Sequence, residues 1–240
     1  MSVLAKAAQV IDVLNHNRFP TKLGALAEEV GLPKSSTHRL LNELVALGIV
    51  RKLEDGNYTP GYRLIQWGQS ADLALGIRQA AEPIMRRLSD AVSESVHLHV
   101  PEGSHRVCAA GVPGPQTLRP VIRLGQILPL GAGASGRLLL AYSDDRVRAD
   151  ARQQADDRVE AAWPDENELA TLRERGWATS TAEVESGLTA ISAVVLTRTG
   201  AALGALTVAG AEARLPEERC AEIRPLVVAA AREIARAIGA

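Results

Sequence analysis

The feature that most constrains the fold is a single break within an otherwise helical stretch, residues 23–47. The break is Gly31-Leu32-Pro33. Glycine suits the left-handed residue that follows one helix, and proline suits the first turn of the next. After the break, apolar or small side chains recur at the helical spacing i, i+3, i+4, i+7 and i+10: Thr37, Leu40, Leu41, Leu44 and Leu47. The pattern predicts a helix-turn-helix whose second helix buries one face and leaves the other free.

A short hairpin is expected directly after the second helix. Residues 48–53 form a β-prone run, residues 54–57 form a polar turn, and residues 58–62 can return as a second strand. Two helices followed by such a hairpin are typical of a winged helix-turn-helix, which we expect over residues 1–68. A helical hairpin packed on a β-ribbon without any nucleic acid remains an alternative at this point.

Polar side chains on the free face of the second helix are candidates for reading base edges in the major groove of DNA: Lys34, Ser35, Ser36, His38, Arg39 and Asn42. In the hairpin, Arg51, Lys52 and Asn57 are expected to meet phosphates. Residues 1–69 carry eight basic and six acidic side chains, whereas the rest of the chain carries 19 and 22. This asymmetry is mild, but its sign suits a DNA-binding N-terminal part.

The composition is that of an ordinary soluble protein and leaves few other classes open. Only Cys108 and Cys220 are present among 240 residues, which excludes a disulfide framework and a CxxC metal motif. No apolar run approaches the ~20 residues that a membrane span needs, and no secretory signal is visible at the N-terminus. We therefore expect a cytoplasmic protein that makes no contact with membranes.

The hydrophobic period changes from helical to alternating near residue 93. Before this point, apolar residues at helical spacing predict a rigid helical linker over residues 69–92. Beyond it we expect strands over residues 96–100, 106–110, 118–124, 191–196 and 202–209, and helices over residues 137–142, 144–162, 169–175 and 217–238. Strands and helices without regular βαβ alternation predict an α+β domain with an antiparallel sheet over residues 93–240.

A glycine-rich loop at residues 131–136 formally matches the dinucleotide fingerprint GxGxxG. Pro129 interrupts the preceding strand and no βαβ unit follows, which argues against a dinucleotide site. Small residues here would instead let the backbone N–H groups of Gly133, Ala134 and Ser135 approach an anionic ligand at a helix N-terminus. The alternative is that the glycines only form a tight turn that starts a helix.

Two histidines on one face of a strand, His97 and His99, would permit a metal site together with His105 and Cys108. Strand alternation explains the pair equally well as the solvent face of a half-buried strand. No further ligand completes a tetrahedral set, so no metal or other cofactor is predicted. No Ser/His/Asp order, activated cysteine or pair of catalytic carboxylates is visible, so we do not expect an enzyme.

With these segments in view, the chain resembles the IclR family of bacterial transcriptional regulators over nearly its whole length. The segments that carry the resemblance are GLPKSSTHRLLNEL, GIVRK, GNYTPGYRL, LGQILPLGAGASGRLLLAY, RERGWATSTAEVESGLTAISAVV and GALTVAG. The resemblance implies a winged-helix DNA-binding domain, a helical linker and a GAF-like or PAS-like effector domain. It also implies homodimers or dimers of dimers, and a small organic effector, often a carboxylate or aromatic acid.

The resemblance also implies where the effector would bind. It adds an acidic pocket residue, Glu183 or Glu185, and the strand residue Thr207 to the glycine-rich loop. Ala193 and Ala209 stand where the family often has Pro and Ser, and Gly131 stands where a His is common; these departures concern the identity of the ligand. A carboxylate beside an anionic ligand costs free energy unless one of the two is protonated or the carboxylate accepts a hydrogen bond from a ligand hydroxyl. The alternative is that Glu183 or Glu185 is a solvated loop charge.

The sequence as a whole predicts a DNA-binding transcriptional regulator that responds to a small organic acid. Two recognition helices related by dimer symmetry would enter successive major grooves about 34 Å apart, so the double-stranded operator should be palindromic. The alternative is a small-molecule enzyme or metal sensor whose N-terminal part only mediates association. Binding to the DNA just upstream of the protein's own gene would separate the two.

Overall fold

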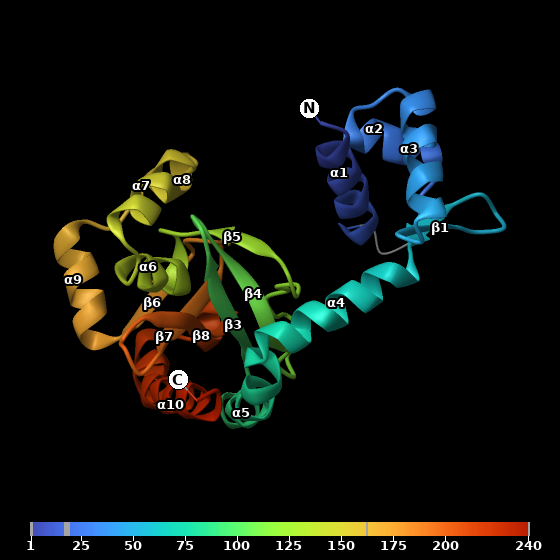
Figure 1. The fold of residues 1–240 in the computed structure, drawn as a ribbon. Helices are drawn as coiled ribbons and strands as arrows, with labels where there is room; N and C mark the ends of the chain where they lie inside the picture. The colour runs from blue at the N-terminus through green and yellow to red at the C-terminus, as the bar shows by residue number, and fades with distance from the viewer. Residues whose placement is uncertain (1, 17–19, 162, 240) are drawn as a thin grey trace. The chain divides into compact units, whose positions relative to one another are not determined.

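The computed structural model describes residues 2–16, 20–161 and 163–239 (Figure 1). The chain divides into two compact units, Met1–Leu75 and Gly76–Ala240. The predicted linker, residues 69–92, spans this division: its first residues end a helix of the first unit, and the rest form a helix that packs on the sheet of the second. Among the residues described, no helix combines the length and the apolar character that crossing a membrane requires.

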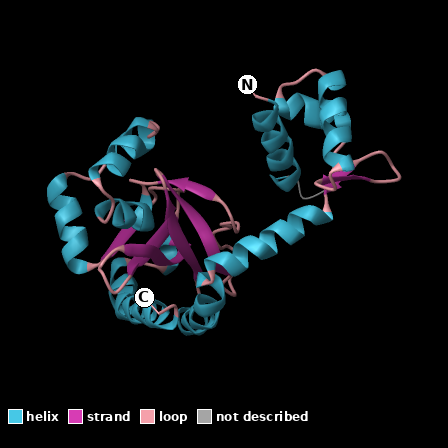
Figure 2. Ribbon diagram, viewed as in Figure 1, coloured by secondary structure: helices cyan, strands magenta, loops and turns pink. Residues whose placement is uncertain are grey.

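The first unit is a helix-turn-helix with a two-stranded wing, as predicted (Figure 2). Its elements in chain order are α1 (Val3–His16), α2 (Leu23–Val30), α3 (Lys34–Ala46), β1 (Val50–Lys52), β2 (Tyr58–Pro60) and α4 (Tyr62–Leu75). Strands β1 and β2 pair antiparallel. The core of the unit joins α1, α2, α3 and the wing through Val10, Leu14, Leu26, Leu41 and Tyr58.

Local backbone chemistry fixes the turn and the wing. Gly31 adopts φ +67° after α2, and Thr37, which is fully buried, donates from Oγ1 to the carbonyl of Pro33 at 3.1 Å. Gly61 donates its N–H to the Ile49 carbonyl at 2.7 Å, and a Cβ at Gly61 would lie 2.2 Å from the Gly48 oxygen. Only glycine therefore lets the end of the wing approach the backbone that enters it.

The second unit contains a six-stranded antiparallel sheet in the order β5-β4-β3-β8-β7-β6. The strands are β3 (Ser95–Glu102), β4 (His105–Val112), β5 (Ile127–Pro129), β6 (Trp177–Thr181), β7 (Leu188–Leu196) and β8 (Ala202–Ala211). The helices are α5 (Ile77–Val92), α6 (Gly133–Ala141), α7 (Asp145–Gln153), α8 (Asp157–Ala161), α9 (Glu166–Arg175) and α10 (Glu217–Ala237). The predicted α+β class with an antiparallel sheet is confirmed.

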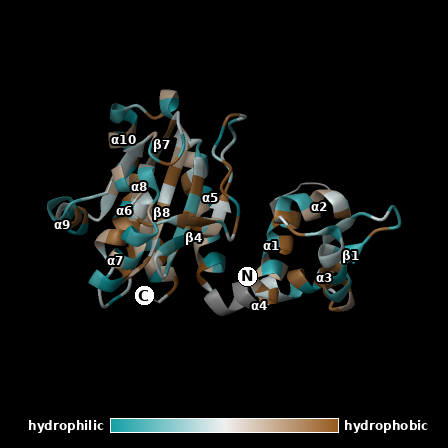
Figure 3. Ribbon diagram, turned by 90° about the horizontal axis from the view of Figure 1, so that it is seen from above, coloured by the Kyte–Doolittle hydropathy of each residue, from teal (hydrophilic) through white to brown (hydrophobic). Residues whose placement is uncertain are grey.

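Helices cover both faces of this sheet. Helices α5 and α10 pack on one face, against Val96, Leu98, Ile191 and Leu206, and α6 with α9 packs on part of the other, against Ala178 and Val194. Figure 3, coloured by hydropathy, shows hydrophobic residues along the strands between these helices. Because neighbouring side chains of a strand alternate between faces, the residues between those of the first core point toward α6.

Two predicted elements differ from the structure, and two strands were missed. Residues 118–124 are not a strand, because Pro120 lies in the middle of the segment and lacks the N–H group that a ladder needs, and the segment from residue 113 to 126 runs as a loop. The predicted helix over residues 144–162 is divided into α7 and α8, and residue 162 lies outside the described residues. Strands β5 and β6 were not predicted.

Candidate functional site

The exposed face of α3 gathers all six side chains predicted for base recognition. Lys34, Ser35, Ser36, His38, Arg39 and Asn42 are exposed, while Thr37, Leu40, Leu41 and Leu44 are buried on the opposite face. The core therefore holds the helix by one side and presents the other as one continuous polar surface. An α-helix of this kind matches the width of the DNA major groove.

The wing presents two positioned cations beside this helix. Arg51 and Lys52 lie on β1 and are exposed. The Arg51 guanidinium lies 4.6 Å from the centre of the Tyr62 ring, and Lys52 Nζ lies 5.9 Å from the centre of the Tyr58 ring. Cation–π contacts of this kind restrict the motion of the side chains while leaving the charges open to phosphates.

Asn57, the third predicted wing residue, has a different role in the structure. Its Nδ2 donates to Asp55 Oδ2 at 2.7 Å, and its backbone N–H donates to Asp55 Oδ1 at 3.0 Å. The side chain is half-buried and closes the wing turn. The amide that was expected to meet a phosphate is thus engaged within the hairpin.

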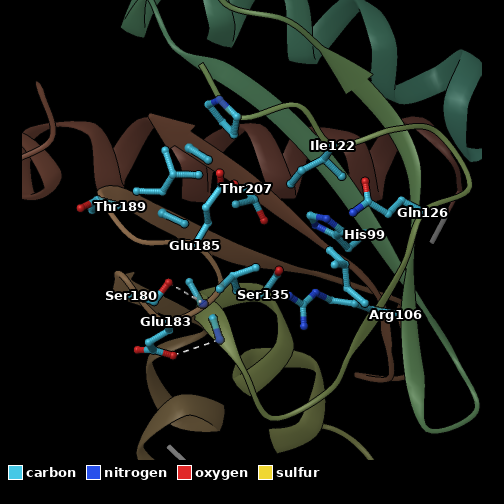
Figure 4. Close-up of a pocket in the computed structure, with 18 of the residues that line it drawn as sticks. His99, Arg106, Ile122, Gln126, Ser135, Ser180, Glu183, Glu185, Thr189 and Thr207 are labelled. Carbon is cyan, nitrogen blue, oxygen red and sulfur yellow. Dashed lines mark hydrogen bonds between the residues drawn. The ribbon is translucent and has the colours of Figure 1, made fainter. Parts of the chain in front are cut away.

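The second unit holds a cavity of about 110 Å³ on the α6 side of the sheet (Figure 4). Its walls come from strands β3, β4, β5, β7 and β8, from the first turn of α6, from the loop 113–126 and from residues 180–188. The sheet supplies polar side chains here because α6 and α9 cover only part of this face. The loop 113–126, which was predicted to be a strand, contributes the apolar side of the wall through Pro120, Val121 and Ile122.

Two buried basic side chains line the cavity. Arg106 is 2% exposed, and its Nη1 donates to the carbonyls of Pro129 and Ala132, the latter at 2.9 Å. Burial lowers the pKa of Arg106 to about 10, against the opposing effect of Glu183, so the guanidinium stays charged at neutral pH. His99 is 1% exposed, and burial, with the charges of Arg106 and His97, holds its pKa well below the usual value. Its imidazole is therefore neutral.

Two of the three backbone N–H groups predicted to meet the ligand, those of Gly133 and Ala134, already have partners. Gly133 N–H donates to Glu183 Oε2 at 3.0 Å, and Ala134 N–H donates to Ser180 Oγ at 2.9 Å. Glu183 is also ion-paired with Arg137 at 2.8 Å. The structure thus contradicts the expectation that both of these N–H groups are open to a ligand. Ser135, by contrast, lines the cavity and makes no side-chain hydrogen bond to the residues described.

Two glycines of the loop are required because neighbouring side chains leave no room for a Cβ atom. A Cβ at Gly136 would lie 2.2 Å from Arg106 Nη1, and Gly133 adopts φ +69° with Val184 Cγ2 2.6 Å from its would-be Cβ. The loop therefore needs glycine both to turn tightly and to leave room for the guanidinium. The two interpretations of the loop, as a ligand-binding segment and as a tight turn, both apply in part, because the loop borders the cavity and also starts a helix.

The remaining predicted effector residues divide between the two faces of the sheet. Thr207 and Ala209 of β8 line the cavity, and Glu185 lies at its exposed margin. Thr207 Oγ1 shares a hydrogen bond of 2.9 Å with Ser192 Oγ. Ala193 is 1% exposed in the core beneath α5 and α10. Its inclusion must be corrected, because strand alternation turns Ala193 away from the cavity that Ala190 lines.

The histidine pair is buried and does not face solvent. His97 is 3% exposed, and burial lowers its pKa to about 4. The interpretation of the pair as the solvent face of the strand is wrong, because His97 and His99 are both buried and residues of the loop 113–126 lie beside His99 in the cavity wall. No group of three or more His, Cys, Asp or Glu side chains in the described part of the chain could hold a metal ion. Neither Arg106 nor Ser180 was predicted as a site residue. The one signal in the sequence for Arg106 was the presence of an arginine in an otherwise apolar strand.

Comparisons with known proteins agree with both units. Residues 3–54 match the family model described as the IclR helix-turn-helix domain, and residues 70–236 match the bacterial transcriptional regulator IclR C-terminal model. The chain is 30% identical to the glycerol operon regulatory protein of Streptomyces coelicolor, covering 98% of this chain and 94% of that protein. It is 28% identical to the HTH-type transcriptional regulator KipR of Bacillus subtilis, covering 98% and 96%.

Solved structures show the same fold. The IclR protein of Thermotoga maritima aligns with a TM-score of 0.76 at 25% identity, covering 99% of this chain and 98% of that one. An IclR homologue from Microbacterium hydrocarbonoxydans, solved in complex with 4-hydroxybenzoate, aligns with a TM-score of 0.83 at 24% identity, covering 99% of both chains.

Proposed function

The chain belongs to the IclR family of transcriptional regulators, and from this premise we propose that it binds a palindromic operator as a homodimer or dimer of dimers and responds to a small organic acid. The helix-turn-helix makes it a DNA-binding regulator. In this proposal residues 1–68 bind DNA, residues 69–92 transmit the signal, and residues 93–240 bind the effector. The packing of α5 on the sheet supports transmission, because a change in the sheet would act on α5 directly.

The DNA part of the proposal rests on the exposed face of α3. A dimer would place two such faces about one helical turn of DNA apart, which is the reason for expecting a palindrome. Arg51 and Lys52 support the orientation, because phosphate contacts from a wing fix the register of a recognition helix without reading sequence.

The observation that carries the effector part is a buried cation in the wall of a small cavity. Arg106 keeps its charge although it is 2% exposed, and the planar guanidinium of an arginine matches the geometry of a carboxylate. The cavity volume of about 110 Å³ compares with the ~150 Å³ of a protein cavity that holds benzene. A small acid thus fits without large rearrangement. The 4-hydroxybenzoate bound to one homologue is also an acid.

The test combines DNA binding with ligand screening on the full chain. Electrophoretic mobility shifts on the DNA upstream of the protein's own gene should show a specific complex whose affinity changes when an active acid is added. Thermal unfolding should identify that acid, because a ligand that binds only the folded state stabilises it by RT ln(1 + [L]/Kd).

Arg106→Gln should lose the thermal shift that the active acid produces, whereas Arg152→Gln should keep it. Arg152 is a matched control because it pairs with Glu160 on the surface, away from the cavity. The Arg106→Gln protein must first be shown to unfold cooperatively. A folded Arg106→Gln protein with an unchanged shift would remove Arg106 from the proposed site. No specific complex on the upstream DNA would favour the enzyme or sensor alternative.

A further inference from the structure

Among the described residues, His99 is the one buried side chain of the cavity wall whose two polar atoms both lack a hydrogen-bond partner. Neither Nδ1 nor Nε2 of its imidazole makes a hydrogen bond, although the residue is 1% exposed. Buried polar groups in native proteins nearly always have hydrogen-bond partners. A buried group without a partner has lost its hydrogen bonds to water and forms no others, which costs free energy. Such an atom in the wall of a ligand cavity indicates the chemistry of what the cavity takes.

The protonation state of His99 narrows that chemistry. Burial, together with the charges of Arg106 and His97, keeps the pKa of His99 well below its usual value, so the ring stays neutral. A neutral imidazole has one N–H donor and one bare nitrogen that accepts. A carboxylate or an oxo group accepts only, and so it suits the N–H alone. A hydroxyl group both donates and accepts, and so it suits whichever nitrogen faces the ligand.

The groups around His99 leave its imidazole nitrogens available for a hydrogen bond to a ligand. Figure 4 shows the His99 ring between Ile122 and Gln126 on one side and Ser135 on the other, with Arg106 next to it. Thr207 is already engaged with Ser192. Arg106 offers the positive charge and His99 a neutral donor and acceptor, so the wall of one cavity of about 110 Å³ includes a partner for an acid group and a partner for a hydroxyl group.

We propose that His99 is a specificity-determining residue that binds a hydroxyl group of the effector, while Arg106 binds the effector's acid group. The effector class is then a short-chain hydroxy acid of a few carbon atoms. This inference rests on the proposed function of the same cavity and narrows it.

The test uses matched acids that differ only in the hydroxyl group. The full chain is titrated calorimetrically with lactate and propionate, and with 2-hydroxybutyrate or 3-hydroxybutyrate and butyrate. At least one hydroxy acid should bind roughly tenfold or more tightly than its partner without the hydroxyl, because the imidazole nitrogen would stay unpaired in the second complex.

Three variants assign the preference to His99. His99→Phe should reduce the preference for that hydroxy acid to near unity, while His99→Gln, which keeps a donor and an acceptor, should restore part of it. His97→Phe is the matched control: it removes a buried imidazole on the same strand face that does not line the cavity, and the preference should persist. Without ligand, His99→Phe should melt at the same temperature or higher, because it removes an unpaired buried polar group.

The outcomes separate this inference from the function on which it rests. Equal affinity for acids with and without the hydroxyl, or an unchanged preference in His99→Phe, would overturn the role of His99 and leave the acid effector standing. No binding of any of these acids would overturn the inference and the short-acid effector together. A lower melting temperature for His99→Phe with an unchanged preference would make His99 a structural residue.

Discussion

The carboxylate of Glu183 accepts a hydrogen bond from the backbone N–H of Gly133 at 3.0 Å and also forms an ion pair with Arg137 at 2.8 Å. The protein therefore places its own negative charge at the N-terminal end of α6, where a helix favours an anion. An effector carboxylate would meet repulsion there. The charge distribution instead favours the guanidinium of Arg106 as the partner of the acid group.

Removing the negative charge of Glu183 should tighten the binding of an acid effector. Glu183→Gln keeps an oxygen that can accept from Gly133 but no longer repels an anion, and the expected gain is on the order of 1 kcal/mol, or about fivefold in affinity. Isothermal titration with the active acid measures it. Glu185→Gln, at the exposed margin of the cavity, should have a smaller effect. Weaker binding in Glu183→Gln would mean that this carboxylate contacts the ligand directly.

Arg39→Ala should weaken binding to the operator and relax base preference. Arg39 is exposed on the free face of α3, and an arginine that reads a base contributes roughly 1–3 kcal/mol of discrimination. Ser36→Ala should act in the same direction. Fluorescence anisotropy on operator variants and on random DNA of equal length measures the effect. Equal losses on both DNAs would show that Arg39 does not read bases.

Lys52→Ala should lower affinity for all DNA sequences alike. Lys52 is exposed on the wing, where a cation meets phosphates, so the slope of log affinity against log salt should become shallower by about one. The salt series is measured on operator and on random DNA. A loss confined to the operator would place Lys52 at a base instead.

Gly61→Ala should disrupt the wing, because its new Cβ would lie 2.2 Å from the Gly48 oxygen and the backbone must shift. We expect a loss of about 1–3 kcal/mol in the opening free energy of the first unit, together with weaker DNA binding. Hydrogen exchange of the full chain measures the opening. Gly68→Ala in α4, where a Cβ would meet no neighbour, is the control and should be neutral or stabilising by up to about 1 kcal/mol. Equal behaviour of the two variants would contradict the steric argument.

The first unit could be predicted from the sequence because its signals are local. Gly31, Pro33 and the apolar spacing of α3 each act within a few residues, and the structure agrees with them. Strand β6 was missed because its residues, Trp177–Thr181, include small and hydroxyl side chains without a clear apolar alternation. It is a strand because it pairs along β7, and that partner is remote in the sequence.

The cavity could be predicted only in part, for the same reason. The loop before α6 and Thr207 carry recognisable patterns, but the burial of His99 depends on a loop, residues 113–126, that the sequence suggested as a strand. Arg106 becomes a site residue because it reaches the carbonyls of Pro129 on the neighbouring strand β5 and of Ala132 in the loop that follows it. Neither fact can be inferred from spacing along the chain.

Burial of His97 should make stability depend on pH below neutrality. The folded chain holds the pKa of His97 at about 4, against 6.5 for the ordinary group, so between these values the unfolded chain binds a proton that the folded chain does not. The free energy of unfolding therefore falls as the pH drops from about 6.5 to 4, and His97 alone should contribute a loss of about 2 kcal/mol between pH 7 and pH 5. His99, whose pKa is also lowered, acts in the same direction.

Urea unfolding at both pH values should show a smaller difference in the free energy of unfolding for His97→Phe than for the natural chain, with an unchanged dependence on urea concentration. If the variant lost as much stability as the natural chain, His97 would have to be protonated in the folded protein, and its burial could not be the origin of acid sensitivity.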